Sequence, residues 1–433
     1  MDARTHVRHD HTVERSVKRA ARRHASARFD ADGDAVMFRE REVGRAAGLR
    51  RSRTRAAAFA AHIGLDLDAL RAHAATTIVV TGSKGEGTAA VYASAVLAAA
   101  RLRVGTLTSP GLRTNRERIR VDGSAIAPHD YRALIARVES ALDAASGALP
   151  DNGYLAPTGL FTLAAVRHFL DSGCDAWVLE AGMGGASDEV SLFAPGVLVL
   201  TPVFSEHVGI LGDTVADIAR DKLGAATHET RAVMTLPQPH PEAAASLEAA
   251  PAPVHVVNSA PLDDVAWPPA LIGANARLGV AAALQLLKPD GTAPDPAALR
   301  ATLATVTLPG RMSVHVRDGR EWRVDTATNG EAVRAALSWS DAATSASDVL
   351  LCVPDGKDVA GVRAALSTLP FTSLRTDAPH LSFGSWPTRP PSLQEIDLDA
   401  LGSRVLALGT VHFIGDVMEL LDVDTERSFT PRR

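Results

Sequence analysis

The stretch that most constrains the fold is residues 76–88, TTIVVTGSKGEGT. Its β-branched run, Thr77 to Val80, predicts a buried parallel strand that breaks into a glycine-rich turn. The residues that follow, AAVYASAVLAAARL, are good helix formers, so Thr88 falls at a helix start. Strand, glycine loop and helix are the context of a phosphate-binding loop, whose backbone N–H groups face phosphate oxygens. An ordinary strand-to-helix turn is the alternative interpretation.

The candidate nucleotide-binding residues of this loop are Gly82, Ser83, Lys84, Gly85, Glu86, Gly87 and Thr88. The Thr88 hydroxyl is placed to ligate the Mg²⁺ ion that accompanies a nucleotide. The position directly before the last Gly-Thr pair normally holds a lysine that neutralises phosphate charge, and here it holds Glu86. Lys84 is the nearby lysine, two positions early, and is able to pair with Glu86 or to reach the phosphate itself.

Composition limits the class of protein. A chain of 433 residues with 46% apolar and 22% charged residues is globular and long enough for two or three domains. A formal net charge of −5 argues against a nucleic-acid partner, and we expect no run able to span a membrane. The two cysteines, Cys174 and Cys352, lie in or beside apolar runs, which indicates buried, reduced thiols and a cytoplasmic protein.

The order of elements predicts an α/β fold with a doubly wound, mostly parallel sheet, because strands and helices alternate along most of the chain. Residues 1–75 form a basic, mostly helical N-terminal segment. Residues 76–295 form a central nucleotide-binding domain that ends at a proline-rich stretch, KPDGTAPDP. Residues 296–433 form a second α/β domain.

A second block of the chain carries further chemistry. The run CDAWVL predicts a strand that ends at Glu180, before the glycine loop AGMGG. A carboxylate at the carboxyl end of such a strand points into the crevice where open α/β sheets bind ligands. His207 follows the next strand at the same edge, and Lys222 ends the helix TVADIARDK. Taken singly, these residues are equally explained as a strand-end acid, a hydrogen-bonded loop histidine and a cation at a helix C-terminus.

Several motifs in order resemble the folylpolyglutamate synthase and dihydrofolate synthase family, within the Mur-type amide ligases. The resemblance extends from about residue 60 to 423 and is carried by TGSKGEGT, TSPGLRTNRERIRVDG, LEAGMGG, EHVGILGDTVADIARDKLG, PGR at 309–311, DTATNG from Asp325, Asp355 to Asp358, and GTVHFIGDV from Gly409. It implies a P-loop-type central domain and a smaller Rossmann-like C-terminal domain. It also implies that ATP phosphorylates a carboxylate, and that an amino acid amine then attacks the acyl phosphate to form an amide.

The resemblance implies a set of residue roles. Thr88 and Glu180 would hold one Mg²⁺ and His207 a second. Lys222 matches the lysine that the family carbamylates into a metal ligand, so the candidate catalytic and metal residues are Lys222, His207, Glu180 and Thr88. Arg311 and Asp325 would contact ATP from the C-terminal domain, and Asn275 begins the helix that carries the family's adenine contact. The implied partners are a small carboxylate and an amine, while a protein partner or a homo-oligomer stays open.

The chain departs from the family pattern mainly on the ATP side. Glu86 replaces the phosphate lysine, Gly279 replaces an asparagine and Thr328 replaces a histidine. On the folate side, Gly111 replaces a histidine, and residues 186–189 read ASDE where the family loop has an arginine. Two hypotheses follow. The chain is an ATP-dependent ligase for a specialised, non-folate acid, or it is a degenerate homologue that serves an active ligase as a binding or scaffold partner. A housekeeping folate enzyme is a third, weaker reading.

Overall fold

The computed structural model describes residues 33–258, 262, 264–341, 347–378 and 381–432. The chain divides into two compact units. The large unit contains residues 33–111, 115–308 and 426–432, and the small unit contains residues 112–114 and 309–425. Residues 33–75 thus share a unit with the central sheet, and the boundary expected at residue 295 falls at Pro309. The basic stretch of residues 1–32 lies outside the described residues.

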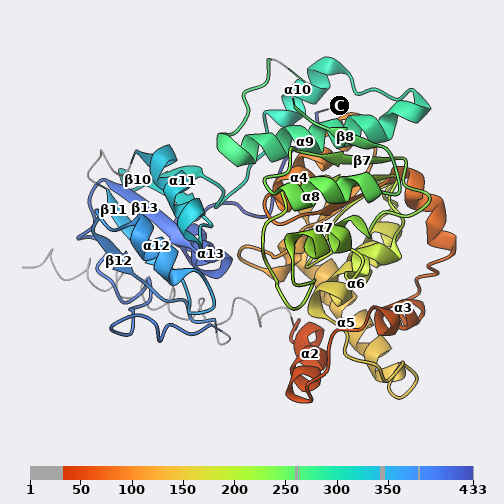
Figure 1. Cartoon of the computed structure of the whole chain (residues 1–433), viewed down its shortest axis with the longest axis horizontal. Helices are drawn as coiled ribbons and strands as arrows, with labels where there is room; N and C mark the ends of the chain where they lie inside the picture. The colour runs from red at the N-terminus through yellow and green to blue at the C-terminus, as the bar shows by residue number, and fades with distance from the viewer. Residues whose placement is uncertain (1–32, 259–261, 263, 342–346, 379–380, 433) are drawn as a thin grey trace, which may run out of the picture. The chain divides into compact units, whose positions relative to one another are not determined.

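The large unit alternates helices and strands as expected (Figure 1). Its α-helices are α2 (Val36–Ala46), α3 (Arg53–His62), α4 (Glu86–Ala99), α5 (Pro128–Ala144), α6 (Pro157–Asp171), α7 (Val215–Leu223), α8 (Pro241–Ser246), α9 (Ala270–Leu287) and α10 (Pro296–Leu303). Its strands are β1 (Thr77–Thr81), β2 (Val104–Leu107), β3 (Ile119–Val121), β4 (Ser124–Ala125), β5 (Ala176–Glu180), β6 (Val197–Leu200), β7 (Ala232–Thr235) and β8 (Val254–Val256). Short 3₁₀ helices are η1 (Ala69–Thr76), η2 (Asn115–Arg118), η3 (Glu189–Leu192), η4 (Leu247–Ala249) and η5 (Lys288–Asp290).

The eight strands form one sheet in the order β4-β3-β2-β5-β1-β6-β7-β8. All pairs from β2 to β8 are parallel, and β3 and β4 join antiparallel at one edge. β1 lies between β5 and β6, with Val80 opposite Glu180 on one side and Val199 on the other. The chain therefore leaves the carboxyl end of β1 beside the ends of both neighbours, which is where ligands bind in such sheets.

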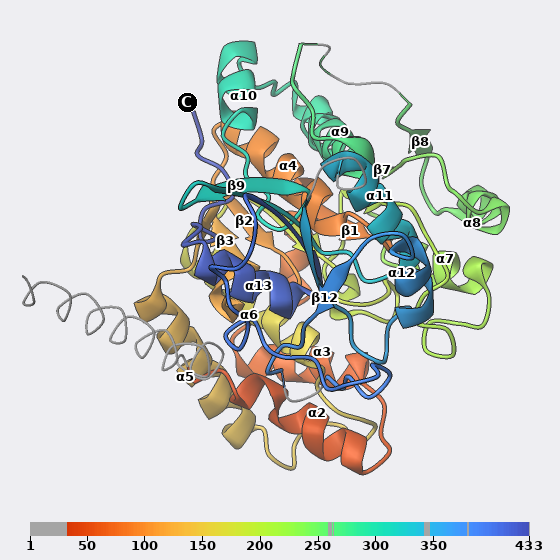
Figure 2. The same ribbon diagram turned by 90° about the vertical axis from the view of Figure 1, so that its left-hand side faces the viewer.

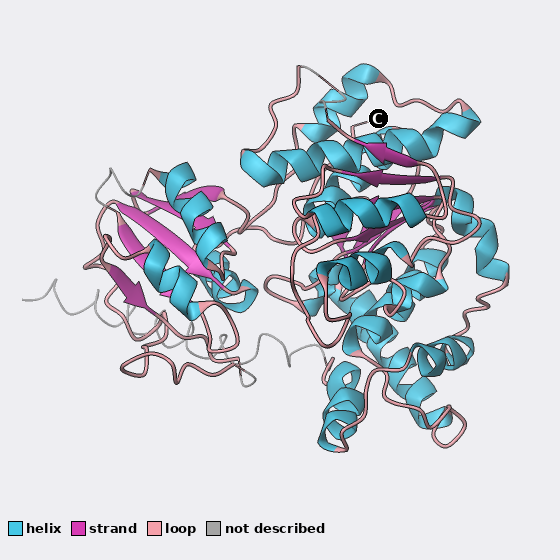
Figure 3. Ribbon diagram, viewed as in Figure 1, coloured by secondary structure: helices cyan, strands magenta, loops and turns pink. Residues whose placement is uncertain are grey.

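Helices cover both faces of this sheet (Figure 3). Because side chains alternate along each strand, a core forms on each face. On β1, Ile78 and Val80 pack with α4 and α9, while Val79 packs with α5, α6 and α7. Helix α10 joins the α4 side through Leu299 and Leu303, which explains why the unit extends past the proline-rich stretch. The predicted doubly wound sheet is confirmed.

The small unit is a five-stranded sheet in the order β12-β11-β13-β10-β9. Its elements are β9 (Ser313–Arg317), β10 (Arg320–Asp325), α11 (Gly330–Ser340), β11 (Asp348–Cys352), α12 (Val359–Ala365), β12 (Phe371–Ser373), β13 (Arg404–Gly409) and α13 (Val411–Leu420). Only β9 pairs antiparallel, against β10. Figure 2 shows α11 and α12 on one side of the sheet and α13 on the other, in agreement with two separate apolar clusters.

Residues 112–114 belong to the small unit and residues 426–432 to the large unit, although each segment is distant in sequence from most of its unit. Arg113, in the crossing segment 112–114, donates to the carbonyl oxygen of Val423 in the small unit at 2.9 Å. The C-terminal tail returns to the large unit, where Ser428 N donates to Gly123 O at 2.8 Å. Among the described helices, α9 is long and apolar enough to cross a membrane, but 56% of it is buried within the fold, as in a core helix. Cys174 and Cys352 are buried free thiols, as expected.

Candidate functional site

The glycine loop at the end of β1 has a geometry that requires its glycines. Gly82 and Gly85 have φ values of 149° and 95°, and Gly85 is the N-cap of α4. A Cβ at Gly82 would overlap Thr201, and one at Gly85 would overlap Asn275. The loop therefore needs glycine at both positions for backbone conformation and for space. The backbone of this loop thus lies close against Thr201 and Asn275.

Neighbouring elements hold this loop from three sides. Ser83 N donates to Pro202 O at 3.1 Å, and Phe204 N donates to the Ser83 hydroxyl at 3.1 Å. From α9, the Asn275 side chain donates to Lys84 O at 3.3 Å. Two buried polar atoms beside the loop, Thr201 Oγ1 and Asn275 Oδ1, have no hydrogen-bond partner within the described residues. Such orphaned atoms at a glycine cradle fit a polar ligand.

Glu180 lies next to the loop at the end of β5. Its side chain is buried, and its Oε2 accepts a hydrogen bond from Ser109 N at 2.7 Å. A Cβ at Gly87 would lie 3.4 Å from the same oxygen, so this carboxylate faces the residue before Thr88. The buried Thr88 hydroxyl and the Glu180 carboxylate are hard oxygen donors. One or two such groups with substrate phosphates suit Mg²⁺.

The last turn of α7 contacts both glycine loops through consecutive residues. The buried Lys222 amine donates to Gly82 O and to Glu206 Oε1, the latter at 3.0 Å. The Asp221 carboxylate accepts from Gly185 N at 2.9 Å and from Ser187 N at 3.2 Å. A Cβ at Gly184 would overlap Asp221, which explains the glycine there. One helix end thus fixes the loop after β1 and the loop after β5.

Glu86 is the first residue of α4 and half-buried. Burial raises the pKa of its carboxyl, and the positive charge of Lys222 is the largest opposing influence. Lys84, the other lysine of the loop, is exposed. A carboxylate therefore sits where phosphate-binding loops place an ammonium, and the buried Lys222 is the cation that acts on it most strongly.

His207 lies in an exposed turn with φ of 51°, which is closed by a bond from Gly209 N to Gly212 O at 3.0 Å. Val208 and Ile210 in this turn are also exposed. In the part of the chain that the structure describes, no group of three or more His, Cys, Asp or Glu side chains is placed to share a metal ion. The oxygen donors beside Thr88 fit one Mg²⁺ with phosphate ligands, and the role of His207 remains a prediction.

In the small unit, Arg311 and Asp325 lie close together. Met312 N donates to the Asp325 carboxylate at 3.1 Å, and Arg311 donates to the hydroxyl of Thr326. Asp355 and Asp358, which follow β11, form hydrogen bonds within the small unit. Hydrogen bonds from Ser382 and Ser385 lower the pKa of Asp355 to about 2, and Asp358 accepts from Gly330 N at 3.0 Å. These two aspartates bind the backbone of their own unit.

Sequence reasoning missed three residues of the large-unit site, which are Thr201, Glu206 and Asp221. Each lies beside a residue or strand that the sequence singled out. Their contacts, however, join separate parts of the chain, from 16 positions apart for Glu206 and Lys222 to 119 for Thr201 and Gly82, so local spacing carries little signal for them. Adjacency to His207 and Lys222 was the signal that could have found Glu206 and Asp221.

No family model matches the chain. A probable bifunctional folylpolyglutamate synthase/dihydropteroate synthase of Haloferax volcanii is 37% identical over 150 residues, or 34% of this chain and 17% of the relative. The dihydrofolate synthase/folylpolyglutamate synthase of Mycobacterium tuberculosis is 33% identical over 156 residues, or 35% of this chain and 32% of the relative. The matched region thus spans at most about a third of these curated relatives.

The structural matches cover far more of the chain. Folylpolyglutamate synthase of M. tuberculosis, solved with ADP and AMPPCP, matches with a TM-score of 0.72 and 24% identity over 90% of this chain and 99% of its own. The apo L. casei enzyme matches with a TM-score of 0.72 and 21% identity over 86% and 97%. The E. coli enzyme with DHPP and ADP has a TM-score of 0.68 and 24% identity over 86% and 93%. The chain thus has the two-domain fold of the Mur-type ligases, and its curated and structural neighbours are folylpolyglutamate and dihydrofolate synthases.

Proposed function

We propose that this chain is an ATP-dependent ligase that joins a small carboxylic acid to an amine in the cytoplasm. The observation that carries the proposal is the pair of glycine loops at the ends of β1 and β5, with the Glu180 carboxylate facing Gly87, the residue before Thr88. The neighbours' names and their nucleotide complexes support the same chemistry. Bound ATP would supply the phosphoryl group that activates the acid, and Mg²⁺ would offset its negative charge.

The residues of the chain have separable tasks in this proposal. The N–H groups at the start of α4 bind phosphate oxygens, as helix N-termini do. Thr88 and Glu180 hold the metal ion, and the bond from Ser109 N keeps the Glu180 carboxylate oriented. Lys222 and Asp221 fix the two loops at a constant separation. Arg311 and Asp325 are the candidate nucleotide residues of the small unit.

We further propose that the acid is not a folate. Gly111 stands where the family has a histidine, and residues 186–189 contain no arginine where the family loop has one, so this chain offers fewer of the family's groups to a folate-like substrate. A site without those groups would hold a different or smaller acid, because specificity depends on polar groups that are paired in the complex. The substrate pair is thus a specialised carboxylate and an amino acid or other amine.

A second candidate is a degenerate homologue that binds an active ligase. Glu86 favours it, because an uncompensated carboxylate beside phosphates is repulsive. Gly279 favours it too, since a Cβ there would overlap the backbone of Ala89 in α4, leaving no room for the family's asparagine. The retained oxygen donors at Thr88 and Glu180 favour the ligase.

The test is ADP release from ATP and Mg²⁺ in the presence of panels of carboxylic acids and amines. We expect release that requires one acid and one amine together. Glu180→Gln should raise the Mg²⁺ concentration needed for ADP release at least about tenfold. The variant removes a ligand charge but keeps the shape of the side chain and the acceptor for Ser109 N. The exposed Glu139→Gln is the matched control. Release unaffected by Glu180→Gln would contradict the proposal.

A further inference from the structure

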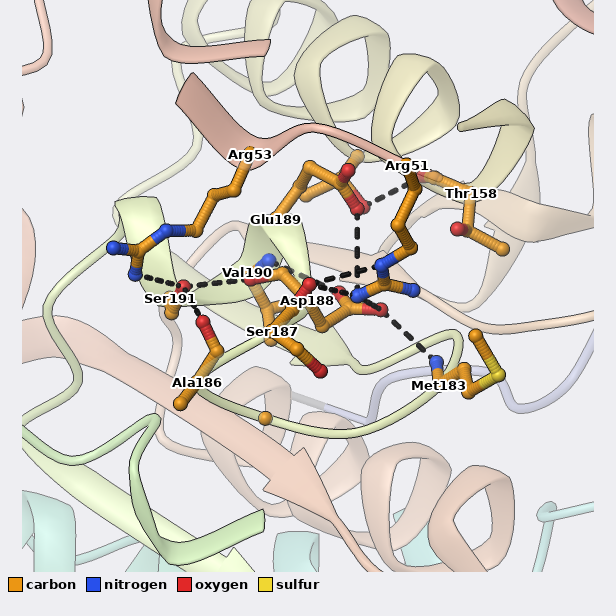
Figure 4. A network of polar contacts seen from close by, with 12 residues as sticks. Arg51, Arg53, Thr158, Met183, Ala186, Ser187, Asp188, Glu189, Val190 and Ser191 are labelled. Atoms are coloured by element: carbon orange, nitrogen blue, oxygen red, sulfur yellow. Dashed lines mark hydrogen bonds and ion pairs between the residues drawn. The ribbon is translucent and has the colours of Figure 1, made fainter. Parts of the chain in front are cut away.

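An arginine from a distant part of the chain binds the loop that follows β5, the strand that ends at Glu180 (Figure 4). Arg51, just before α3, donates through Nε to Ser187 O at 2.9 Å and through a second nitrogen to the same oxygen. The guanidinium also reaches the Asp188 carboxylate at 3.4 Å. Asp188 in turn accepts from Met183 N at 2.9 Å and from Val190 N at 3.1 Å. The Arg51 guanidinium and the Asp188 carboxylate therefore fix residues 183–190, together with Asp221 of α7.

Glu189 is a second carboxylate in this loop, directly after Asp188, and it is fully buried. Neither of its oxygens has a hydrogen-bond partner within the described residues, and its Oε2 lies 4.0 Å from Arg51. Its side chain packs against the first turn of α6, where a Cβ at Gly159 would overlap it. When ionised, this buried carboxylate is only partly compensated for lost solvation, because Arg51 lies beyond hydrogen-bond distance from it. The packing against Gly159 also leaves it no room to turn toward solvent within the closed loop.

Ionised Glu189 would share its cations with a second carboxylate. Asp188 lies on its own segment, and Arg51 and Arg53 face it from the start of α3. Arg53 is engaged with the Ser191 hydroxyl at 2.9 Å on the exposed side. The first two turns of α6, residues 157–162, carry no charge. Two carboxylates thus share Arg51, whose guanidinium already serves Ser187 and Asp188.

We propose that Arg51, Asp188 and Glu189 form a proton-dependent clasp on the loop of residues 183–191, closed when Glu189 is neutral and loosened when it is ionised. Ionisation adds a negative charge that the closed clasp cannot solvate, so the loop opens to admit water or a cation. Burial, and after it the charge of Asp188, raise the pKa of Glu189 to about 7, which places the transition in the neutral range. This proton dependence does not require that the chain use ATP. It makes the conformation of the second glycine loop depend on pH.

The test is hydrogen exchange of peptides that cover residues 183–191 at about pH 6 and about pH 8, with rates corrected for the intrinsic pH dependence of exchange. In the unmodified chain we expect protection of the loop to fall on the order of tenfold at the higher pH. Glu189→Gln, which stays neutral, should keep the loop equally protected at both values. The exposed Glu139→Gln should behave as the unmodified chain. A pH response that survives in Glu189→Gln, or that is absent from the unmodified chain, would overturn the proposal.

Two further measurements separate the clasp from a general loss of structure. Arg51→Lys keeps the charge but loses the two-pronged donation to Ser187, so it should lower loop protection at both pH values while peptides of α5 stay protected. Infrared difference spectra between the unmodified chain and Glu189→Gln should show a protonated carboxyl band below about pH 7 that disappears above it. Absence of that band would overturn the proposal even if the variant were poorly folded in the exchange experiment.

Discussion

The Lys222 amine donates a hydrogen bond to the carbonyl oxygen of Gly82, the first glycine of the phosphate-type loop. The residue before it, Asp221, binds the backbone of the second glycine loop at Gly185 and Ser187. The end of α7 therefore sets the distance between the two loops that flank β1 and β5. In the proposed function, α7 is the element that holds the nucleotide-binding and metal-binding groups in fixed relative positions.

Removal of the Asp221 charge should loosen the second glycine loop. Its carboxylate accepts from Gly185 N, Ser187 N and the Ser187 hydroxyl, the last at 3.0 Å. We expect Asp221→Asn to lower the free energy of unfolding by roughly 1 to 3 kcal/mol, since an amide cannot accept all of these bonds. Urea unfolding measures this, with the exposed Asp213→Asn as the control. Equal midpoints for the two variants would contradict the account.

Replacement of Lys222 should abolish turnover. Lys222→Ala removes the donor to Gly82 and leaves the Glu206 carboxylate without its ion-pair partner beside the loop. Activity with and without bicarbonate then tests carbamylation, because a carbamate forms only when carbon dioxide is available. The exposed Lys288→Ala is the control. An unchanged rate of turnover in Lys222→Ala would show that Lys222 has no part in the mechanism.

Glu86→Lys should raise the affinity for ATP. The change replaces a repulsive carboxylate at the start of α4 with the ammonium that such loops normally carry. We expect a gain of about tenfold or more in affinity by calorimetric titration, with Glu86→Gln giving a smaller gain. No gain from the lysine would mean that the loop serves another ligand.

Gly279→Asn should destabilise the protein without strengthening ATP binding. A Cβ at this position would overlap the carbonyl group of Ala89, so α9 would have to move away from α4. Overpacking of this kind costs roughly 1 to 3 kcal/mol. Gly291→Asn is the control, because a Cβ there meets nothing within 4 Å and asparagine tolerates its φ of 64°. Similar thermal midpoints for both variants would contradict the close packing.

Folding stability should fall as pH rises through the neutral range. Burial raises the pKa of Glu189 from its ordinary value of 4.5 to about 7 in the folded chain. The folded state therefore binds this proton more tightly than the unfolded state. The stabilisation is complete below about pH 4.5 and is lost by about pH 7, an effect on the order of 3 kcal/mol. Urea unfolding across this window should show the slope, and Glu189→Gln should lack it.

The strand, loop and helix of the phosphate-type site could be predicted because their signals are local. The β-branched run of β1, the glycines and the helix formers of α4 lie within one stretch, and Glu180 ends an equally clear strand. The clasp at Arg51 and the position of Asp221 could not, because each joins segments far apart in the chain. Glu189 carried no signal at all, since its burial depends on how α6 packs over η3.

Calorimetric titration of the full chain with ATP and Mg²⁺, in the presence of bicarbonate, tests the central claim most directly. The account predicts binding in the micromolar to sub-millimolar range that depends on Mg²⁺ and is at least about tenfold weaker in Glu180→Gln. Binding that ignores Mg²⁺, or no detectable binding, would contradict the ligase and favour the degenerate homologue that serves a partner.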